Sequence, residues 1–373
     1  MARRPAHIPL TRPSAPPFTV VAPHLKKVAD SGFWTNAVYV RKLEQRAEKL
    51  LDVPYAVAVS SATSGLMLVT RLLGLTGEVI VPSFTFFATA LPLLWHNLVP
   101  VYCDCDPETF NADPKSVERL ITKKTSAIIA VHVFGCPADV SALTRVAKKH
   151  GLRLIFDAAH GFGAAYRGKP LGNYGDAEVF SLSPTKLAPA GEGGIITTRS
   201  AELAKELKIA RDYGNPGDYD CRIVGLNARL SEFNAVFGWA ALQRLPRMAE
   251  RRRKLAERYK TQLAGLPGLK FQKIPPDCLS SFKDFSVLID PPQAGFTRDD
   301  LAAFLTEQRI DTRKYFYPPV HRQKIFSHYH RKNQHLPITD YVTDHILSLP
   351  LYSHQKTAEI DRVIRTIELC YRK

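Results

Sequence analysis

Short apolar runs alternate with amphipathic stretches over the first two thirds of the chain. Runs rich in apolar and β-branched residues predict strands at Tyr55–Val59, Glu78–Val81, Val99–Cys103, Ser126–Val131, Arg153–Phe156, Ala177–Ser181 and Gly194–Thr198. Apolar residues at helical spacing predict helices at Val38–Asp52, Ser64–Leu73, Pro114–Ile121, Val140–His150 and Ala201–Tyr213. This alternation predicts an α/β fold with a mostly parallel sheet between helices, whose ligand lies at the carboxyl ends of the strands.

The alternation fades after about residue 230. The pattern predicts two helices there, Leu230–Leu242 and Pro246–Leu263. Further along, it predicts a strand at Phe282–Ile289 and helices at Arg298–Gln308 and Thr357–Tyr371. This mixture indicates a second, smaller α+β domain.

The N-terminal segment differs in composition from the rest of the chain. It contains the prolines Pro5, Pro9, Pro13, Pro16, Pro17 and Pro23. Because proline fixes φ and lacks a backbone N–H, we expect an extended arm over residues 1–23, either packed across a partner subunit or loose. The large domain is then expected over residues 24–245 and the small domain over residues 246–373.

Composition and charge narrow the class of protein. The 373 residues are 45% hydrophobic and 23% charged, which is typical of a globular protein and excludes a disordered, collagen-like or coiled-coil chain. The net charge of +16 attracts anions, such as nucleic acid, acidic lipid or phosphorylated small molecules. The basic residues are scattered and show no nucleic-acid-binding motif, so phosphorylated small molecules fit better than nucleic acid.

Several familiar signatures are missing from the sequence. The six cysteines include no CxxC pair, so we expect reduced cysteines, a cytoplasmic location and no metal site. No apolar run reaches about 18 residues, so no membrane span is expected. The sequence has no Walker A motif, no GxGxxG after a first strand, no GxSxG and no HExxH.

Two segments that follow predicted strands carry candidate binding residues. Ser60–Gly65 is rich in hydroxyl side chains where a strand turns into a helix. Such a helix start either binds a phosphate or is capped by its own Ser or Thr. Phe84–Phe87 places aromatic rings at a strand end, where they either stack on a planar cofactor or pack in the core.

Three further segments carry charged or polar groups. Asp157 ends an apolar strand, so it either pairs with a cation, such as a protonated ring nitrogen, or caps the next turn. Lys186 follows another strand and precedes a GEGG segment; a desolvated lysine there can form a Schiff base, whereas a surface lysine cannot easily do so. Gly225–Leu230 is a polar loop before a helix or a simple helix start.

The order of these segments resembles the fold-type I enzymes of pyridoxal phosphate, and more narrowly the DegT/DnrJ/EryC1/StrS family of sugar aminotransferases. The matching stretches are SSATSGL, EVIVPSFTFFATA, VPVYCDCDPETFNADP, AIIAVHVFGCPADV, FDAAHGFGAAYRGKPLGNYGDAEVFS, PTKLAPAGEGG and VGLNARLSEFNAVFG. The resemblance extends from about Gly32 to the C-terminus and includes TRKYFYPPVHRQ and LSLPLY. It implies a pyridoxal 5'-phosphate cofactor bound in the large domain.

The resemblance also implies roles for single residues. Lys186 would hold the cofactor as a Schiff base and move protons, and Asp157 would pair with the pyridine nitrogen. Phe86 would cover one ring face and His160 would contact the ring or its phenolic edge. The phosphate would be bound by Thr63, Ser64 and Ser181. Members that act as dehydratases carry His in place of the lysine, so Lys186 argues against that activity.

The family pattern further implies shared active sites. Asn227 would reach the cofactor phosphate of the other subunit in a homodimer. Tyr315 and His321 would contact substrate, with loops such as Asn215–Arg222 contributing to substrate choice. Leu182 departs from the Phe that is common at its position, and no loss of chemistry is expected from it.

The resemblance implies an aminotransferase that acts on a keto sugar linked to a nucleoside diphosphate, at carbon 3 or carbon 4. L-Glutamate is the expected amino donor. Two alternatives remain: a transaminase of a cyclitol or another small ketone, and a non-catalytic sugar-binding regulator of the same fold. Lys186 together with Asp157 argues against the regulator, because a binding protein does not need both.

Overall fold

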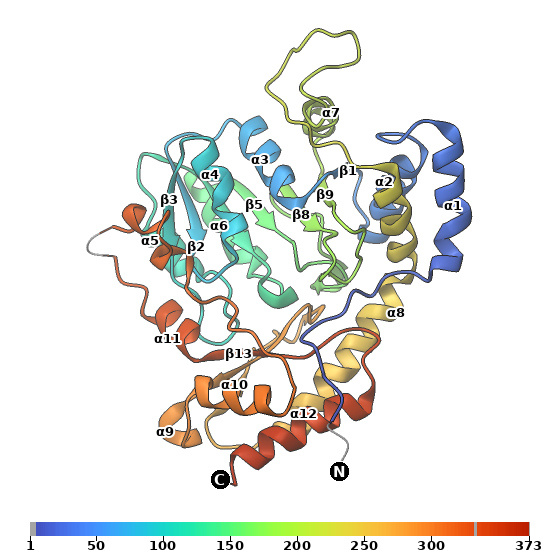
Figure 1. Cartoon of the computed structure of the whole chain (residues 1–373). Coiled ribbons are helices and arrows are strands. Elements are labelled where there is room, and N and C mark those ends of the chain that lie inside the picture. Colours follow the sequence, from blue (N-terminus) through green and yellow to red (C-terminus); the bar gives the residue numbers. More distant parts are fainter. Residues whose placement is uncertain (1–4, 332–333, 373) are drawn as a thin grey trace.

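The computed structural model describes residues 5–331 and 334–372; residues 1–4 of the predicted arm and the last residue of the predicted small domain lie outside them. A seven-stranded sheet with the order β1-β9-β8-β5-β4-β2-β3 forms the centre of the large domain (Figure 1). Its strands are β1 (Tyr55–Val59), β2 (Glu78–Pro82), β3 (Val99–Cys103), β4 (Thr125–Val131), β5 (Arg153–Asp157), β8 (Ala177–Ser181) and β9 (Gly194–Thr198). Strand β9 pairs antiparallel with β1 and β8, and the remaining pairs are parallel.

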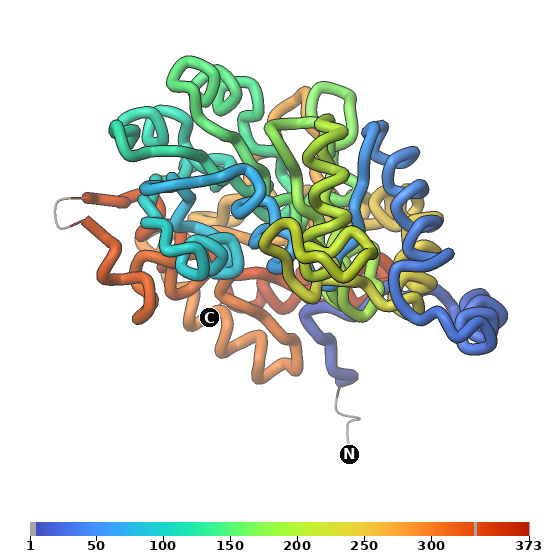
Figure 2. Tube along the Cα trace, turned by 90° about the horizontal axis from the view of Figure 1, so that it is seen from above, coloured from blue at the N-terminus to red at the C-terminus, as the bar shows by residue number. Residues whose placement is uncertain are grey.

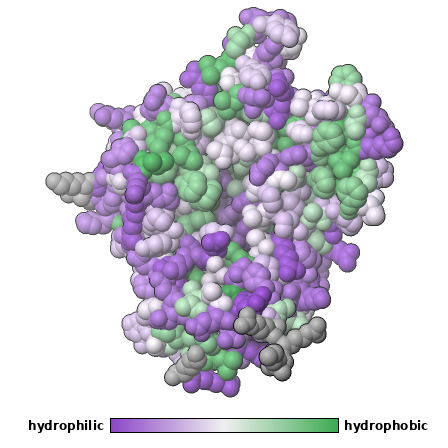
Figure 3. Space-filling view, viewed as in Figure 1, coloured by the Kyte–Doolittle hydropathy of each residue, from purple (hydrophilic) through white to green (hydrophobic). Residues whose placement is uncertain are grey.

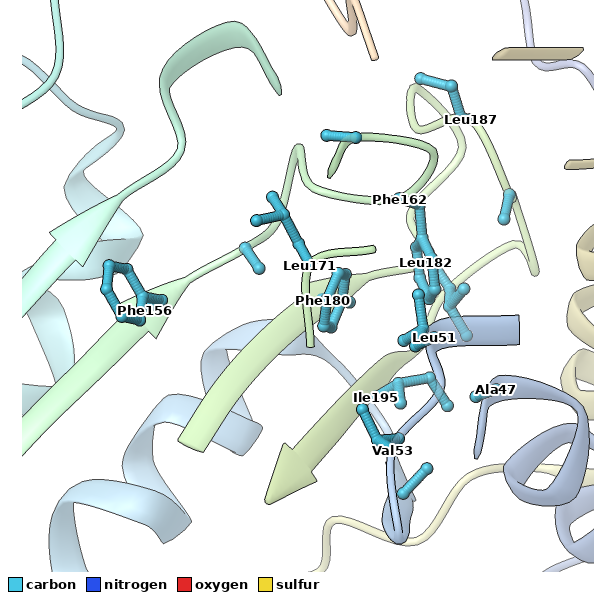
Figure 4. Packing of buried hydrophobic residues seen from close by; sticks show 14 of the residues in the cluster. Ala47, Leu51, Val53, Phe156, Phe162, Leu171, Phe180, Leu182, Leu187 and Ile195 are labelled. Atoms are coloured by element: carbon cyan, nitrogen blue, oxygen red, sulfur yellow. The ribbon is translucent and has the colours of Figure 1, made fainter. Parts of the chain in front are cut away.

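Helices cover both faces of this sheet. One face packs with α2 (Val38–Leu51), α5 (Pro114–Arg119), α6 (Val140–His150) and the first part of α8 (Glu232–Leu263). Figure 4 shows part of this core, in which Phe180 of β8 lies near Leu182, while Phe156 of β5 lies further along the sheet. The other face packs with α3 (Ala62–Leu72), α4 (Leu91–Trp95) and α7 (Ala201–Ala210). Burial on both faces explains why the strands read as nearly continuous apolar runs.

The small domain packs around a three-stranded sheet of the order β10-β12-β13. Its elements are β10 (Leu269–Phe271), β12 (Phe285–Ile289), β13 (Ile346–Leu349), α9 (Pro291–Ala294), α10 (Arg298–Glu307) and α12 (Thr357–Cys370). A short sheet of β6 (Ala165–Tyr166), β7 (Lys169–Pro170) and β11 (Cys278–Leu279) joins the domains. Helix α11 (Pro337–His345) precedes β13.

The two helices predicted on either side of residue 245 are one helix, so that prediction is wrong. Helix α8 runs for 32 residues with Pro246 inside it. Leu245 and Ala249 pack in the core of the large domain, whereas Leu255 and Tyr259 pack in the core of the small domain. Burial in two cores stabilises the helix beyond what the proline costs.

The predicted extended arm is wrong in its last residues, because α1 (Phe18–Ser31) is a helix that contains Pro23. Residues 5–17 do form an extended segment, but it packs on the small domain of its own chain. Ile8 bridges Ile310, and Leu351 N donates to Leu10 O at 3.1 Å. Over these residues the arm therefore packs on the small domain of its own chain.

Seen from above in Figure 2, the α1–α2 pair and the segment of residues 320–331 lie on opposite sides of the molecule. Between them, β1, β2, β5 and β8 all end at the same edge of the sheet, where β9 begins. The residues that follow these strands meet at this edge, close to the small domain. None of the helices described here is long and apolar enough to cross a membrane.

Candidate active site

A cavity of about 180 Å³ lies at this edge of the sheet. It is lined by Ser61, Ala62, Thr63, Leu66, Thr85, Phe86, Ala88, Val131, Asp157, Ala159, His160, Ser181, Ser183, Lys186, Glu192 and Phe316. Six residues that the sequence singled out are among them: Thr63, Phe86, Asp157, His160, Ser181 and Lys186. The segments that the sequence separates by more than a hundred residues thus converge on one space.

Lys186 lies in the loop between β8 and β9, where its backbone N–H donates to Ser183 O at 3.0 Å. The pKa of Lys186 is lowered from the ordinary lysine value to about 7, first by desolvation and then by repulsion from Lys283. A lysine with this pKa is partly neutral at neutral pH. Its amine can therefore act as a nucleophile, unlike that of a surface lysine.

Asp157 ends β5 and is buried. Both carboxylate oxygens are held: Thr89 Oγ1 donates to Oδ2 at 2.7 Å and Ala159 N donates to Oδ1 at 3.0 Å. The Thr89 hydroxyl is itself 2.9 Å from Thr85 Oγ1. The carboxylate therefore caps the next turn and faces the cavity at once, so the two readings of Asp157 are compatible.

Sequence reasoning missed Thr89 and left Thr85 without a role. Both belong to the segment after β2, where Thr89 ends a short 3-10 helix, Phe87–Thr89. No local pattern in the sequence marks this pair, because Thr85 lies in a bend and Thr89 in the 3-10 helix that follows it.

The first turn of α3 forms one end of the cavity. Ser61 caps this helix, and its side chain accepts from Ser64 N at 3.0 Å. The Ser64 hydroxyl donates to Ser61 O at 2.8 Å and does not line the cavity. The capping interpretation therefore fits Ser64, whereas Ser61 and Thr63 lie where a bound anion would meet the free N–H groups of the helix.

Glycine at position 194 allows this end of the cavity to form. A Cβ atom on Gly194 would lie 2.7 Å from Ala62 N and 2.8 Å from Ser61 O. Gly194 pairs with Val59 of β1 and Ser181 of β8, so the first residue of β9 packs directly against the backbone of the α3 N-terminus.

His160 and two aromatic rings line other sides of the cavity. The pKa of His160 is held well below the ordinary histidine value by burial and by the charge of Lys186. Its Nδ1 is buried and has no hydrogen-bond partner among the described residues. The imidazole lies nearly parallel to the Phe316 ring, with centroids 6.5 Å apart. Phe86 lines the cavity but is half exposed, and its ring centroid lies 4.0 Å from that of Phe87.

A second groove of about 580 Å³ opens next to the cavity and shares Thr85, Phe86 and Phe316 with it. Tyr315, one of the two predicted substrate residues, lines this groove. His321 lines neither space: its Nδ1 is 2.6 Å from Ser83 Oγ and its Nε2 is 3.2 Å from Asp340 Oδ1. His321 therefore links the residue that follows β2 to helix α11, and it contacts neither the cavity nor the groove.

Asn227 is exposed and does not line the cavity of its own chain. It forms a backbone bridge with Asp212 at the base of the loop that follows α7. Figure 1 shows this loop projecting from the top of the molecule.

Comparison with known proteins matches residues 21–368 to the DegT/DnrJ/EryC1/StrS aminotransferase family. The chain is 34% identical to a UDP-N-acetyl-3-dehydro-alpha-D-glucosamine 3-aminotransferase of Acidithiobacillus ferrooxidans, over 91% of each chain. It is 36% identical to a protein of Geobacillus stearothermophilus named pleiotropic regulatory protein, over 93% of each chain.

Among solved structures, the chain is similar to DesI in the presence of its TDP-sugar product. The TM-score is 0.93 at 36% identity, and the match covers 98% of this chain and 93% of DesI. The α/β fold and the resemblance predicted from the sequence are thus confirmed, and the chain belongs to the DegT/DnrJ/EryC1/StrS aminotransferase family.

Proposed function

We propose that the chain is a pyridoxal-phosphate-dependent aminotransferase that converts a keto sugar linked to a nucleoside diphosphate into the amino sugar. The amine would enter at carbon 3 or carbon 4, with L-glutamate as donor. The observation that carries the proposal is the pairing, in one cavity, of the Lys186 amine with the buried carboxylate of Asp157. A lysine nucleophile and a fixed carboxylate are the two groups that this cofactor requires from a protein.

The residues of the cavity fit pyridoxal phosphate. Asp157 would hold the ring nitrogen, and the first turn of α3 with Ser61, Thr63 and Ser181 would hold the phosphate. These two ends lie along one sheet edge with β9 and β8 between them. His160 Nδ1, buried without a partner, offers a polar atom to a bound ring. When bound, the cofactor supplies an electron-accepting ring and carries the amino group between two substrates.

Each side chain around the bound cofactor would have one role. Asp157, fixed by Thr89 and Ala159, would pair with the ring nitrogen and favour its protonated form. The Lys186 amine, partly neutral near pH 7, accepts and returns a proton at the substrate carbon. Phe86 and Phe316 cover the site and exclude water.

The substrate class rests on the relatives and on the neighbouring groove. The relative from Acidithiobacillus acts on a UDP-linked sugar, and DesI was solved with a TDP-sugar product. The groove beside the cavity is lined by Tyr315, Tyr317 and Phe87, together with Lys314 and other basic side chains. Aromatic rings and cations suit a nucleobase and a diphosphate. Tyr315 remains our candidate substrate residue, whereas the geometry does not support His321.

We also propose a homodimer with shared active sites. Exposed apolar side chains gather near α1 and α2, and Figure 3 shows apolar surface there; they include Phe18, Phe33, Trp34 and Val38. Patches of this kind mark protein interfaces. Asn227, which is exposed and does not line the cavity of its own chain, is then available to a neighbouring subunit.

A mixing experiment tests the shared sites. Lys186→Ala and Asn227→Asp subunits, each inactive alone, should regain up to about a quarter of normal activity after random exchange. About half of the dimers would then be mixed, and half of the sites in a mixed dimer carry neither lesion. Light scattering must first show that the Asn227→Asp chain is dimeric. No recovery after proven exchange would contradict the role of Asn227 in a second subunit.

The name of the Geobacillus relative favours one alternative, a regulator of the same fold. A second alternative is a transaminase of a cyclitol or another small ketone. Purified protein, pyridoxal phosphate and L-glutamate should be incubated with a panel of keto sugar nucleotides and a keto cyclitol. A product with the mass of an amino sugar nucleotide supports the proposal; an amino cyclitol alone supports the second alternative, and no transfer to any acceptor supports the regulator.

A further inference from the structure

The aromatic segment, which comprises residues 314–319, brings two rings from the small domain to the candidate site. Phe316 lines the cavity, and Tyr315 lines the groove beside it. Directly before this segment, Arg313 exchanges two backbone hydrogen bonds with Ser348 of β13, at 3.2 Å and 2.7 Å. The first end of the segment is therefore held by the sheet of the small domain.

The second end is held by Ser83, a fully buried residue that follows β2 in the large domain. Val320 N donates to Ser83 O at 3.0 Å, and His321 N donates to Ser83 Oγ at 3.0 Å. The same hydroxyl lies 2.6 Å from Nδ1 of the buried His321 ring. These contacts join the aromatic segment to the large domain through one residue.

The contacts of the His321 ring assign its protonated nitrogen. Nε2 lies 3.2 Å from Asp340 Oδ1, and an ionised carboxylate can only accept, so Nε2 carries the hydrogen. Burial lowers the pKa of His321 to about 4, so the ring is neutral near pH 7 and Nδ1 is an acceptor. The Ser83 hydroxyl therefore donates to Nδ1 while it accepts from the His321 backbone.

The Ser83–His321 contact joins the two sides of the groove. One side is lined by Thr85, Phe86 and Phe87, which follow Ser83 closely in the chain. The other side is lined by the aromatic segment, which directly precedes the residues bonded to Ser83. The separation of the two sides therefore depends on this contact, although neither Ser83 nor His321 lines the groove.

We propose that His321 is a positioning residue that holds the two sides of the groove at the separation that a nucleotide requires. The inference rests on the proposed function in taking the groove as the site of the nucleoside diphosphate. His321 touches neither the groove nor the cavity and acts through Ser83. Without its bond to Ser83, nucleotide binding must also order the aromatic segment, and this ordering weakens binding.

Two substitutions separate the two contacts of the ring. In His321→Asn the side-chain amide takes the place of Nδ1 and can still accept from Ser83. In His321→Gln the amide reaches the place of Nε2 and can meet Asp340 but not Ser83. The full-length chain, loaded with pyridoxal phosphate, is titrated with UDP and with TDP in a calorimeter. The affinity should be about tenfold lower in His321→Gln, since a buried hydroxyl is left without its acceptor, and unchanged in His321→Asn.

Further variants separate this contact from general packing. Ser83→Ala breaks it from the other side and should lower the affinity as His321→Gln does. The double variant Ser83→Ala/His321→Gln should lower it no further, because both changes remove one interaction. The matched control is Tyr259→Phe, which removes a buried hydroxyl that donates to Pro350 O at 3.0 Å in the small domain. It should lose stability but keep the affinity.

Hydrogen exchange measures the position of the aromatic segment without any ligand. The peptide that contains it should exchange faster in His321→Gln and Ser83→Ala than in the native chain, and at the native rate in His321→Asn and Tyr259→Phe. Exchange at the native rate in both His321→Gln and Ser83→Ala would contradict the proposal.

Native affinity in His321→Gln overturns the proposal. Equal losses in His321→Asn and His321→Gln also overturn it, because the packing of the ring would then matter and not its bond to Ser83; if His321→Gln does not fold, Ser83→Ala decides. A native chain that binds neither nucleotide overturns it as well. Failure of the proposed function would look different, with the expected changes in nucleotide affinity but no amino transfer to any sugar nucleotide.

Discussion

Gly194→Ala should weaken cofactor binding through the backbone alone. The new methyl group would lie 2.7 Å from Ala62 N, whereas ordinary contacts begin at 3.4 Å, so one backbone must move by about 0.7 Å. Gly194 is held between Val59 and Ser181 by strand pairing, so the α3 N-terminus is the part that yields.

The cost follows from this geometry. Overpacking of a well-packed site costs about 1–3 kcal/mol, and here the contact is with backbone, which has no rotamer to change. Displacement of the first turn of α3 also moves the N–H groups proposed to hold the phosphate. Cofactor affinity should therefore fall about tenfold or more, in addition to the loss of stability.

Thermal unfolding and an absorption titration with pyridoxal phosphate measure the two effects separately. The control is Val363→Ala, a fully buried residue of α12 in the small domain, which should lose stability on the order of 2 kcal/mol and keep its affinity. If Gly194→Ala loses stability but binds the cofactor as tightly as this control, the role assigned to the α3 N-terminus is refuted.

Other changes have equally definite outcomes. Asp157→Asn should fold but lose about 1.5–3 kcal/mol of cofactor binding and nearly all turnover, because an amide cannot keep the ring nitrogen protonated; normal rates would make Asp157 a capping residue only. Thr89→Val should lose about 1.5–3 kcal/mol of stability, measured by denaturant unfolding, because it removes the donor to Asp157 Oδ2. The rate of covalent attachment of pyridoxal phosphate should rise with pH through about 7 and then level off, since Lys186 reacts as the neutral amine above its pKa.

The sheet could be predicted from the sequence because each strand is buried on both faces. Tyr55–Val59, Val99–Cys103, Ala177–Ser181 and Gly194–Thr198 have the predicted bounds, and the others differ by a residue. The wrong predictions concern two helices whose course is determined by tertiary contacts and not by local sequence. Pro23 and Pro246 predict breaks, but Val21 and Val28 of α1 and the core residues of α8 stabilise both helices across them.

The residues of the candidate site, too, could be predicted from the sequence only in part. Asp157 and Ser181 end neighbouring strands and Lys186 lies in the loop that follows one of them, so the parallel sheet brings all three to one edge. Phe316 comes from the small domain, and no local pattern shows that it meets His160. His321 matched a family segment, yet its ring is turned into hydrogen bonds with Ser83 and Asp340, which only the packing of that segment reveals.

The most direct test of the account is to trap the cofactor on the protein. The full-length chain should be mixed with pyridoxal phosphate, reduced with borohydride and digested, and the modified peptide identified by mass spectrometry. We predict modification of Lys186 in the native chain and none at this position in Lys186→Ala, which should also transfer no amine. Modification of another lysine instead, or amine transfer by Lys186→Ala, would contradict the assignment of Lys186 as the reacting group.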